Sequence, residues 1–177
     1  MKRAVFLDRD GTINEDVGDL FEIERVAFIP GAIDALRMLT GKFNLFIITN
    51  QSGIGKGVFD LDRYRSFERE YNRLLKREGI DIIETYCCPH RKDQPCICRK
   101  PSPHFMTAAA EKYGLDLPRS FAIGDHPHDV EMALGAGSKG VYLLTGHGRK
   151  HRGELAAMPH HIADNLLMAV TWILSLE

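Results

Sequence analysis

Short apolar runs rich in β-branched residues alternate with longer segments whose apolar residues recur at helical spacing. This alternation constrains the fold more than any other feature of the chain. The runs predict five strands, at 4–7, 45–49, 82–87, 121–123 and 141–144. The longer segments predict helices at 32–39, 61–77, 103–113, 130–136 and 166–176. Strand–helix alternation is typical of a parallel sheet covered by helices on both faces, so we expect an α/β fold.

Composition favours a single domain over residues 1–177, because 44% hydrophobic and 27% charged residues are ordinary values for one globular core. A net charge of −1 gives no general attraction to nucleic acid or to an anionic membrane. No signal-peptide pattern precedes the first predicted strand, and the apolar stretch 166–176 is too short to span a bilayer. We therefore expect a cytoplasmic monomer that binds neither nucleic acid nor membrane.

Polar side chains stand at the ends of three predicted strands. Asp8 and Asp10 follow the first strand, Thr49 ends the second, and Asp125 follows the fourth. The carboxyl ends of parallel strands meet at one edge of the sheet, where ligands bind. Two carboxylates as close as Asp8 and Asp10 are unfavourable unless a cation shares them, which predicts a divalent metal. The alternative is an acidic surface turn.

The residue types at this edge suit phosphate chemistry. Asp8 has the position of a nucleophile that can attack phosphorus, and Asp10 could protonate a leaving alkoxide and later deprotonate water. Thr49 and the loop after it offer donors to phosphate oxygens, although a plain loop is equally compatible. Lys100 could neutralise the transferring group and Arg99 could bind an oxyanion; a solvated basic turn is the alternative.

A second acidic motif spans residues 124–129. Asp125 and Asp129 are four residues apart at a strand-to-helix turn, which fits a hard cation such as Mg²⁺. A helix N-cap formed by Asp129 is the competing explanation. We interpret His126 and His128 as surface histidines rather than zinc ligands.

The cysteines form a compact pattern, C-x-H-x5-C-x-C, which predicts a closed tetrahedral zinc site. Its members are Cys88, His90, Cys96 and Cys98. Cys87 is the rival of Cys88, but side chains two apart in an extended chain face the same way, which favours Cys88. The site is expected to be structural, since it would staple the polar loop 91–95 and position the basic pair that follows.

These elements, in this order, resemble the haloacid dehalogenase superfamily of phosphatases from residue 5 to about residue 144. The resemblance implies a Rossmann-like three-layer sandwich whose five parallel strands lie in the order 5-4-1-2-3. It implies Mg²⁺ held by the Asp8 carboxylate, the Asp10 carbonyl and the Asp125 carboxylate, with Asp129 orienting its neighbours. Thr49 and Lys100 would stabilise the phosphoryl group. No large insertion follows Gly11 or the third strand, so we expect no separate cap domain.

The zinc loop, which ends in Cys-x-Cys-Arg-Lys-Pro, resembles the subfamily of heptose 1,7-bisphosphate phosphatases and histidinol-phosphate phosphatase domains. Residues 8–14 and 49–54 are closer to the heptose enzymes. The resemblance implies hydrolysis of a small sugar phosphate, the C7 phosphate of D-glycero-D-manno-heptose 1,7-bisphosphate, through an aspartyl-phosphate; histidinol phosphate is the alternative. The implied substrate contacts are Asp16, Val17, Gly18, Asp19, Asn50, Gln51, Ser52, Arg99 and His126. Asp19 stands where the heptose enzymes usually have tyrosine, and His126 where they often have lysine or serine.

Strand-end acids and a zinc loop also occur in proteins of two other functional classes. A non-catalytic zinc-containing module that binds nucleic acid would carry a basic face and exposed aromatic residues, whereas the charge here is balanced. A phosphoacceptor signalling domain also uses strand-end acids and Mg²⁺. Such domains place the paired acids and the phosphorylated aspartate on different strands, whereas Asp8 and Asp10 share one. Phosphate turnover separates both classes from a phosphatase.

Overall fold

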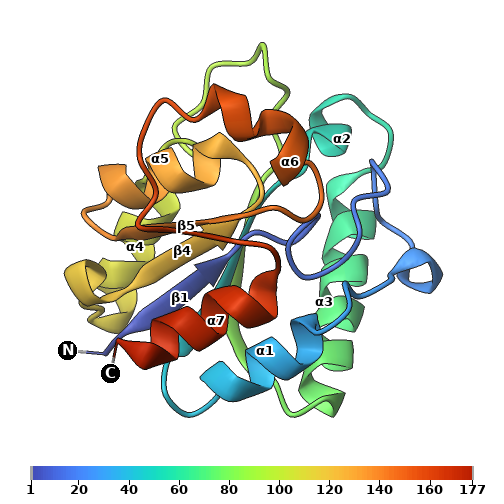
Figure 1. Ribbon diagram of the computed structural model, residues 1–177. Coiled ribbons are helices and arrows are strands. Elements are labelled where there is room, and N and C mark those ends of the chain that lie inside the picture. Colours follow the sequence, from blue (N-terminus) through green and yellow to red (C-terminus); the bar gives the residue numbers. More distant parts are fainter. Residues whose placement is uncertain (1, 177) are drawn as a thin grey trace.

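A six-stranded parallel sheet forms the centre of the molecule, in the order β3-β2-β1-β4-β5-β6 (Figure 1). The structure is a computed structural model and describes residues 2–176. Its strands are β1 (Ala4–Leu7), β2 (Asn44–Asn50), β3 (Ile82–Cys88), β4 (Phe121–Gly124), β5 (Lys139–Leu143) and β6 (His161–Ala163). Its α-helices are α1 (Ala32–Leu39), α2 (Ser52–Gly55), α3 (Leu61–Arg77), α4 (His104–Tyr113), α5 (Pro127–Gly135), α6 (Gly148–His151) and α7 (Leu166–Ser175). Short 3-10 turns cover Ile23–Arg25, Leu117–Arg119 and Arg152–Glu154.

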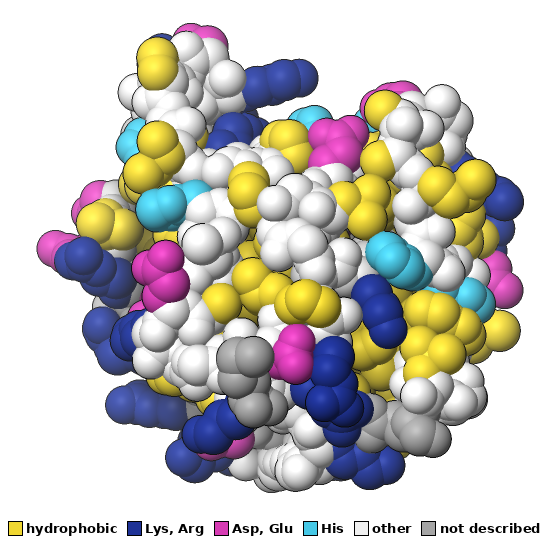
Figure 2. All heavy atoms as spheres, turned by 90° about the vertical axis from the view of Figure 1, so that its left-hand side faces the viewer, with side chains coloured by type: hydrophobic (Ala, Val, Ile, Leu, Met, Phe, Trp, Pro, Cys, Tyr) yellow, Lys and Arg dark blue, Asp and Glu magenta, His cyan; other side chains and the backbone are white. Residues whose placement is uncertain are grey.

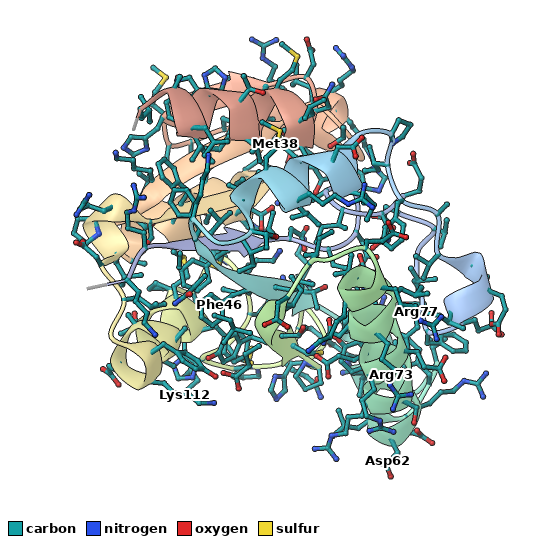
Figure 3. All side chains as sticks on the ribbon, turned by 90° about the horizontal axis from the view of Figure 1, so that it is seen from below. Met38, Phe46, Asp62, Arg73, Arg77 and Lys112 are labelled. Carbon is teal, nitrogen blue, oxygen red and sulfur yellow. The ribbon has the colours of Figure 1, made fainter. Side chains whose placement is uncertain are left out.

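Helices cover both faces of the sheet, which gives the three-layer sandwich that the sequence predicts. Helices α1, α3 and α7 pack on one face and α4 and α5 on the other (Figure 1). Seen from below, Phe46 of β2 lies on the side of α4 (Figure 3). There it packs in the same apolar cluster as Met106 and Ala109 of that helix.

The side chains of β1 alternate between these two cores. Val5 and Leu7 belong to the cluster under α1 and α7, whereas Ala4 and Phe6 belong to the cluster under α4 and α5. All four are buried, so no position of the strand favours a polar residue. This explains why β1 reads as a continuous apolar run that ends at the first charged residue, Asp8.

The predicted count of five strands was one too few. The five predicted strands are present in the predicted order, and β6 extends the sheet beyond β5. This strand is only three residues long and begins with His161, whose ring stacks on Trp172 with centroids 4.5 Å apart. An edge strand this short carries no apolar alternation, and its pairing with β5 depends on backbone hydrogen bonds that leave no mark in the sequence.

The helix boundaries follow the predicted ones closely. Helices α1 and α3 have the predicted limits, and Asn165 caps α7 by accepting a hydrogen bond from the Met168 N–H. Gly114 is the C-cap of α4 with φ +65°, as expected for a glycine that ends a helix. No helix within residues 2–176 has the length and apolar character needed to cross a membrane.

Strand register brings the predicted polar residues to one edge. Leu7 of β1 lies beside Ile47 of β2 and Ile123 of β4. The residues just beyond these positions therefore emerge together at the carboxyl edge, and the Asp8 N–H donates to the Ile123 carbonyl at 2.9 Å. The fold thus places the first acidic motif beside the second.

Candidate active site

A cleft of about 650 Å³ opens at the carboxyl edge of the sheet. It gathers most of the side chains that the sequence singles out. The predicted site residues that line it are Asp8, Asp10, Asp16, Gly18, Asp19, Thr49, Asn50, Gln51, Ser52, Arg99, Lys100, Asp125 and His126. Val17 is not among the lining residues, and 40% of its surface is exposed.

Three carboxylates converge at the base of this cleft. One oxygen each of Asp8, Asp125 and Asp129 lies within 4.8 Å of the others. Burial raises the pKa of Asp125 to about 6, and the neighbouring Asp129 charge adds to the effect. Burial also raises the pKa of Asp8 well above its usual value, against the opposing charge of Lys100. Buried acids this close suit a hard divalent cation, which would favour their ionised forms.

Asp129 is held by the protein from both sides. Its Oδ1 accepts from Lys100 Nζ at 2.7 Å and its Oδ2 from the His126 N–H at 3.1 Å. The second contact, together with the one from the His128 N–H to His126 Nδ1, caps α5. The N-cap residue is thus His126 and not Asp129, which stands at the third helical position and completes the capping box. A contact with the His126 N–H and a place beside Asp8 and Asp125 are therefore compatible for Asp129.

Lys100 is the cation between the acids. Its Nζ lies 2.8 Å from Asp8 Oδ1 and 2.7 Å from Asp129 Oδ1, and only 5% of its side chain is exposed. Burial alone would lower its pKa, but the two carboxylates outweigh burial and raise it, so the ammonium stays charged. The Asp8 donors, Lys100 and the Arg9 N–H, both bind Oδ1. Within residues 2–176, Asp8 Oδ2 accepts no hydrogen bond, so it is available for attack.

Hydrogen bonds from three side chains orient the Asp10 carboxylate. Arg9 donates to both of its oxygens, at 3.1 and 2.8 Å, and Asn14 and Gln51 add one hydrogen bond each, at 2.9 and 3.0 Å. The Asp10 side chain is nevertheless 16% exposed and lines the cleft. It is therefore a fixed carboxylate facing the cleft, as proton transfer requires.

Glycine is required where the two acidic motifs touch. Gly11 has φ +78°, and a Cβ there would overlap the Asp125 carboxylate. A Cβ on Gly124 would overlap the Asp129 carboxylate in the same way. Any side chain at either position would push the acids apart.

The strand-end donors also lie where the sequence predicts. Thr49 is buried at the end of β2, and its Oγ1 accepts from Gln51 Nε2 at 2.8 Å. Asn50 Oδ1 accepts from the Lys100 N–H at 3.2 Å, which ties the end of β2 to the Arg99-Lys100 segment. The loop after β2 therefore forms one wall of the cleft and helps to place the lysine.

The cysteine cluster is assembled as the sequence predicts. The ligand atoms of Cys88, His90, Cys96 and Cys98 all lie within 4.8 Å of one another. Cys88 Sγ lies 3.2 Å from Cys98 Sγ, 3.8 Å from Cys96 Sγ and 3.6 Å from His90 Nδ1. A tetrahedral zinc site with ordinary bond lengths separates its ligands by about 3.8 Å, so the set fits the metal. Cys87 lies outside this group.

Three further residues line the cleft that the sequence did not predict: His147, Lys56 and Lys92. His128, interpreted from the sequence as a surface histidine, is half-buried and lines the cleft as well. The His147 N–H donates to Asp125 Oδ2 at 2.7 Å, and the His147 ring lies 3.2 Å from Asp16 Oδ2. His147 could have been predicted to lie near this edge, because it follows the fifth predicted strand and the carboxyl ends of parallel strands meet there.

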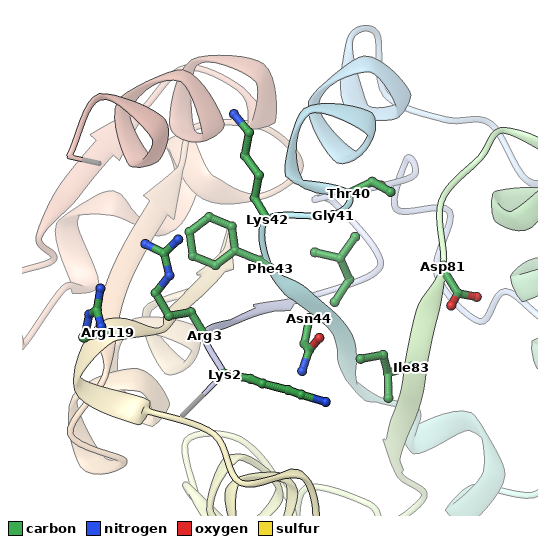
Figure 4. A pocket seen from close by; sticks show the side chains of 11 residues that line it. Lys2, Arg3, Thr40, Gly41, Lys42, Phe43, Asn44, Asp81, Ile83 and Arg119 are labelled. Carbon is green, nitrogen blue, oxygen red and sulfur yellow. The ribbon is translucent and has the colours of Figure 1, made fainter.

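A second cavity of about 610 Å³ lies at the opposite end of the strands (Figure 4). Its charged lining includes Lys2, Arg3, Lys42 and Arg119, and Lys and Arg side chains gather on the lower part of this face (Figure 2). Among the described residues that line it, Asp81 is the only acid. The described lining of this second cavity therefore offers no pair of carboxylates for phosphate chemistry, and we assign that chemistry to the cleft at the carboxyl edge.

Comparison with known proteins agrees with this geometry. The family model described as HAD-hydrolase-like matches residues 97–169. The chain is 39% identical over 164 residues to the D-glycero-beta-D-manno-heptose-1,7-bisphosphate 7-phosphatase of Yersinia pestis, covering 87% of each chain. It is 33% identical over 169 residues to the D-glycero-alpha-D-manno-heptose-1,7-bisphosphate 7-phosphatase of Photorhabdus laumondii, covering 90% of this chain and 92% of that one. The crystal structure of the D,D-heptose 1,7-bisphosphate phosphatase from B. bronchiseptica, complexed with magnesium and phosphate, superimposes with a TM-score of 0.89 at 28% identity, covering 99% of both chains.

Proposed function

Since the chain belongs to the heptose-bisphosphate phosphatase family of HAD-like hydrolases, we propose that this phosphatase removes the C7 phosphate of D-glycero-D-manno-heptose 1,7-bisphosphate. One observation carries the proposal: Lys100 joins Asp8 to Asp129 beside Asp125, within a cleft that Asp10 also lines. In this proposal Asp8 is the nucleophile, Lys100 the buried positive charge and Asp10 the proton donor. A divalent metal ion would bind beside them, at the group of Asp8, Asp125 and Asp129.

The reaction proceeds in two steps at Asp8. In the first, a carboxylate oxygen of Asp8 forms a bond to phosphorus while the bond from phosphorus to the sugar oxygen breaks. The electron pair stays on the sugar oxygen, which takes the proton of Asp10. In the second, water attacks the phosphorus of the aspartyl-phosphate and gives its proton to Asp10. The bond to Asp8 breaks, inorganic phosphate leaves, and both carboxyl groups return to their initial forms.

The donor sets fit one catalytic and one structural metal. Mg²⁺ would be held by the carboxylates of Asp8 and Asp125 and by the carbonyl of Asp10, and a bound Mg²⁺ would neutralise charge on the transferring phosphoryl group. Three acids within 4.8 Å of one another, Asp125 and Asp129 buried and Asp8 partly buried, support this assignment. Zn²⁺ would be held by Cys88, His90, Cys96 and Cys98, where it would tie the 91–95 loop together and help to place Arg99. Arg99 donates to the His90 carbonyl at 3.1 Å, which links that side chain to the cluster.

The cleft suits a small substrate with a second anionic group. Lys56, Lys92 and Arg99 line it together with the strand-end amides. We assign the non-reacting phosphate of the sugar to these cations, with Thr49 and Lys100 binding the phosphoryl group that is transferred. Asp16, Gly18, Asp19 and His126 would face the sugar.

The test is release of inorganic phosphate, in the presence of Mg²⁺, from both anomers of heptose 1,7-bisphosphate, histidinol phosphate and common sugar monophosphates. We expect a heptose 1,7-bisphosphate anomer to have the highest kcat/KM. The Asp8→Asn variant should lose activity at least about a thousandfold and keep its fold and zinc content. Preference for histidinol phosphate would overturn the substrate assignment, and full turnover by Asp8→Asn would overturn the nucleophile.

A further inference from the structure

Arg9, which stands between Asp8 and Asp10 in the sequence, is a buried cation that contacts Asp10 and does not itself line the cleft. Only 2% of its side chain is exposed. Its Nε donates to Asp10 Oδ1 at 3.1 Å and its Nη2 to Asp10 Oδ2 at 2.8 Å. The guanidinium therefore grips the Asp10 carboxylate with two parallel hydrogen bonds, a geometry that lysine cannot reproduce.

Aromatic rings of helix α3 fix this guanidinium from behind. Its Cζ lies 4.9 Å from the ring centre of Phe67, 6.0 Å from that of Tyr64 and 5.9 Å from that of Tyr71. Cation–π contacts of this kind are strongest when they are shielded from water. All three rings belong to α3, so this helix packs against the guanidinium that holds Asp10.

The other Asp10 donors belong to the same framework. Asn14 Nδ2 donates to Asp10 Oδ1 at 2.9 Å, and the Tyr71 hydroxyl donates to Asn14 Oδ1 at 2.9 Å. Gln51 Nε2 reaches Asp10 Oδ2 at 3.0 Å. Each carboxylate oxygen of Asp10 therefore receives two donors, and α3 orients this carboxylate through both Arg9 and Tyr71.

Stability alone is a poor reason for an arginine at this position. Removing a guanidinium from water is costly, and a buried ion pair often stabilises a fold no better than apolar side chains of similar size. The aromatic pocket of α3 would accept an apolar residue. The paired hydrogen bonds from Arg9 instead serve the reaction. Asp10 gains negative charge as its proton leaves, and preorganised donors stabilise charge that develops during a step.

We propose that Arg9 is a positioning residue that fixes the Asp10 carboxylate for proton transfer to the leaving sugar oxygen. The inference rests on the proposed function, because it takes Asp10 as the proton donor. It predicts that, in the first step, Arg9 matters only where the leaving oxygen needs a proton. A sugar alkoxide needs one, whereas 4-nitrophenolate leaves without it.

The experiment compares single-turnover cleavage of heptose 1,7-bisphosphate and of 4-nitrophenyl phosphate in wild type, Arg9→Met and Arg9→Lys. With Arg9→Met, we expect sugar phosphate cleavage to slow about a hundredfold and the nitrophenolate burst to change less than about threefold. The KM for the sugar phosphate should stay near the wild-type value, because Arg9 does not contact the substrate. Arg9→Lys keeps the charge but loses the fork, so it should restore the sugar rate only in part.

Arg63→Met is the matched control. Arg63 also stacks on an aromatic ring, with its Cζ 5.0 Å from the centre of Phe21, but its side chain is 58% exposed and it contacts no cleft acid. This variant should keep both rates. Thermal unfolding monitors the fold, and Arg9→Lys carries the comparison if Arg9→Met does not fold.

Two results would overturn the positioning role: an equal loss on both substrates, as a purely structural residue would give, or no loss on either. If wild type prefers another sugar phosphate, the same comparison is made with that ester, and only the substrate assignment fails. If wild type cleaves no phosphate ester, the proposed function fails and the Arg9 inference fails with it.

Discussion

Replacing Lys100 with methionine would leave two buried carboxylates without the ammonium group they share. Lys100 Nζ lies 2.8 Å from Asp8 and 2.7 Å from Asp129, and both acids are largely or fully buried. Removing one partner of a buried ion pair destabilises a protein by about 3–5 kcal/mol. In a chain of this length, that loss should lower the melting temperature by about 6–20 °C. Loss of the charge should also slow catalysis about 10²- to 10³-fold.

The loss of stability in Lys100→Met should depend on pH and on Mg²⁺. Burial already raises the pKa of Asp8 above its usual value, and loss of the lysine raises it further. A carboxyl group whose pKa is higher in the folded state costs no stability when it is protonated in both states, and it destabilises the fold as the pH rises through its unfolded value. The loss relative to wild type should therefore be small while Asp8 is protonated in both folded proteins, and it should grow as the pH rises above the raised pKa that Asp8 has in wild type. Added Mg²⁺ should stabilise the variant more than wild type, because the three acids lack their internal cation.

Lys112→Met is the control for this experiment, measured by thermal and urea unfolding across pH. Lys112 Nζ also lies 3.0 Å from a carboxylate oxygen, on Glu84, but its side chain is 57% exposed. An exposed pair contributes at most about 1 kcal/mol, so this variant should unfold close to wild type. Equal losses in the two variants, or a Lys100→Met loss that does not change with pH, would refute the reasoning.

Two further substitutions have matched controls within the chain. Cys96→Ser should lose stoichiometric zinc and melt at a lower temperature, whereas Cys87→Ser should keep its zinc. If elemental analysis finds equal zinc content in the two variants, Cys96 is not a ligand. Gly11→Ala and Gly41→Ala share a positive φ and hence a strain of about 1–2 kcal/mol, but only the first places a Cβ against the Asp125 carboxylate. Gly11→Ala should therefore lose phosphate release and additional stability, and equal unfolding curves with intact turnover would contradict the requirement for glycine.

Much of the fold was predictable because its elements have distinct periodicities. Helices α1 and α3 show their 3.6-residue spacing over their whole length, so even their ends were predicted correctly. Strand β6 was missed because three residues are too few for a pattern. The short helices α2 and α6 lie in segments rich in glycine or basic residues, where local sequence favours a loop.

The site was predictable where topology alone brings residues together. Asp8, Thr49 and Asp125 meet because parallel strands end at one edge, and this needs no knowledge of side-chain contacts. Arg9 was missed because a charged residue between two acids reads as exposed, and only the packing of α3 reveals that it is buried. His147 was missed because it reaches Asp125 through its backbone N–H, which has no side-chain signature.

The reacting groups sit at or near the ends of buried strands, whereas much of the remaining cleft wall belongs to the segments 15–20 and 91–99 and to the short helix α2 with its flanking residues. Apart from Leu20 and Ile54, which pack in or against one apolar cluster, mutations in these segments can accumulate without disturbing the sandwich. Evolution can therefore alter which ester is accepted while the hydrolytic apparatus stays the same. Asp19 and His126, where the sequence departs from the pattern of the heptose enzymes, are the positions at which such divergence should first be sought.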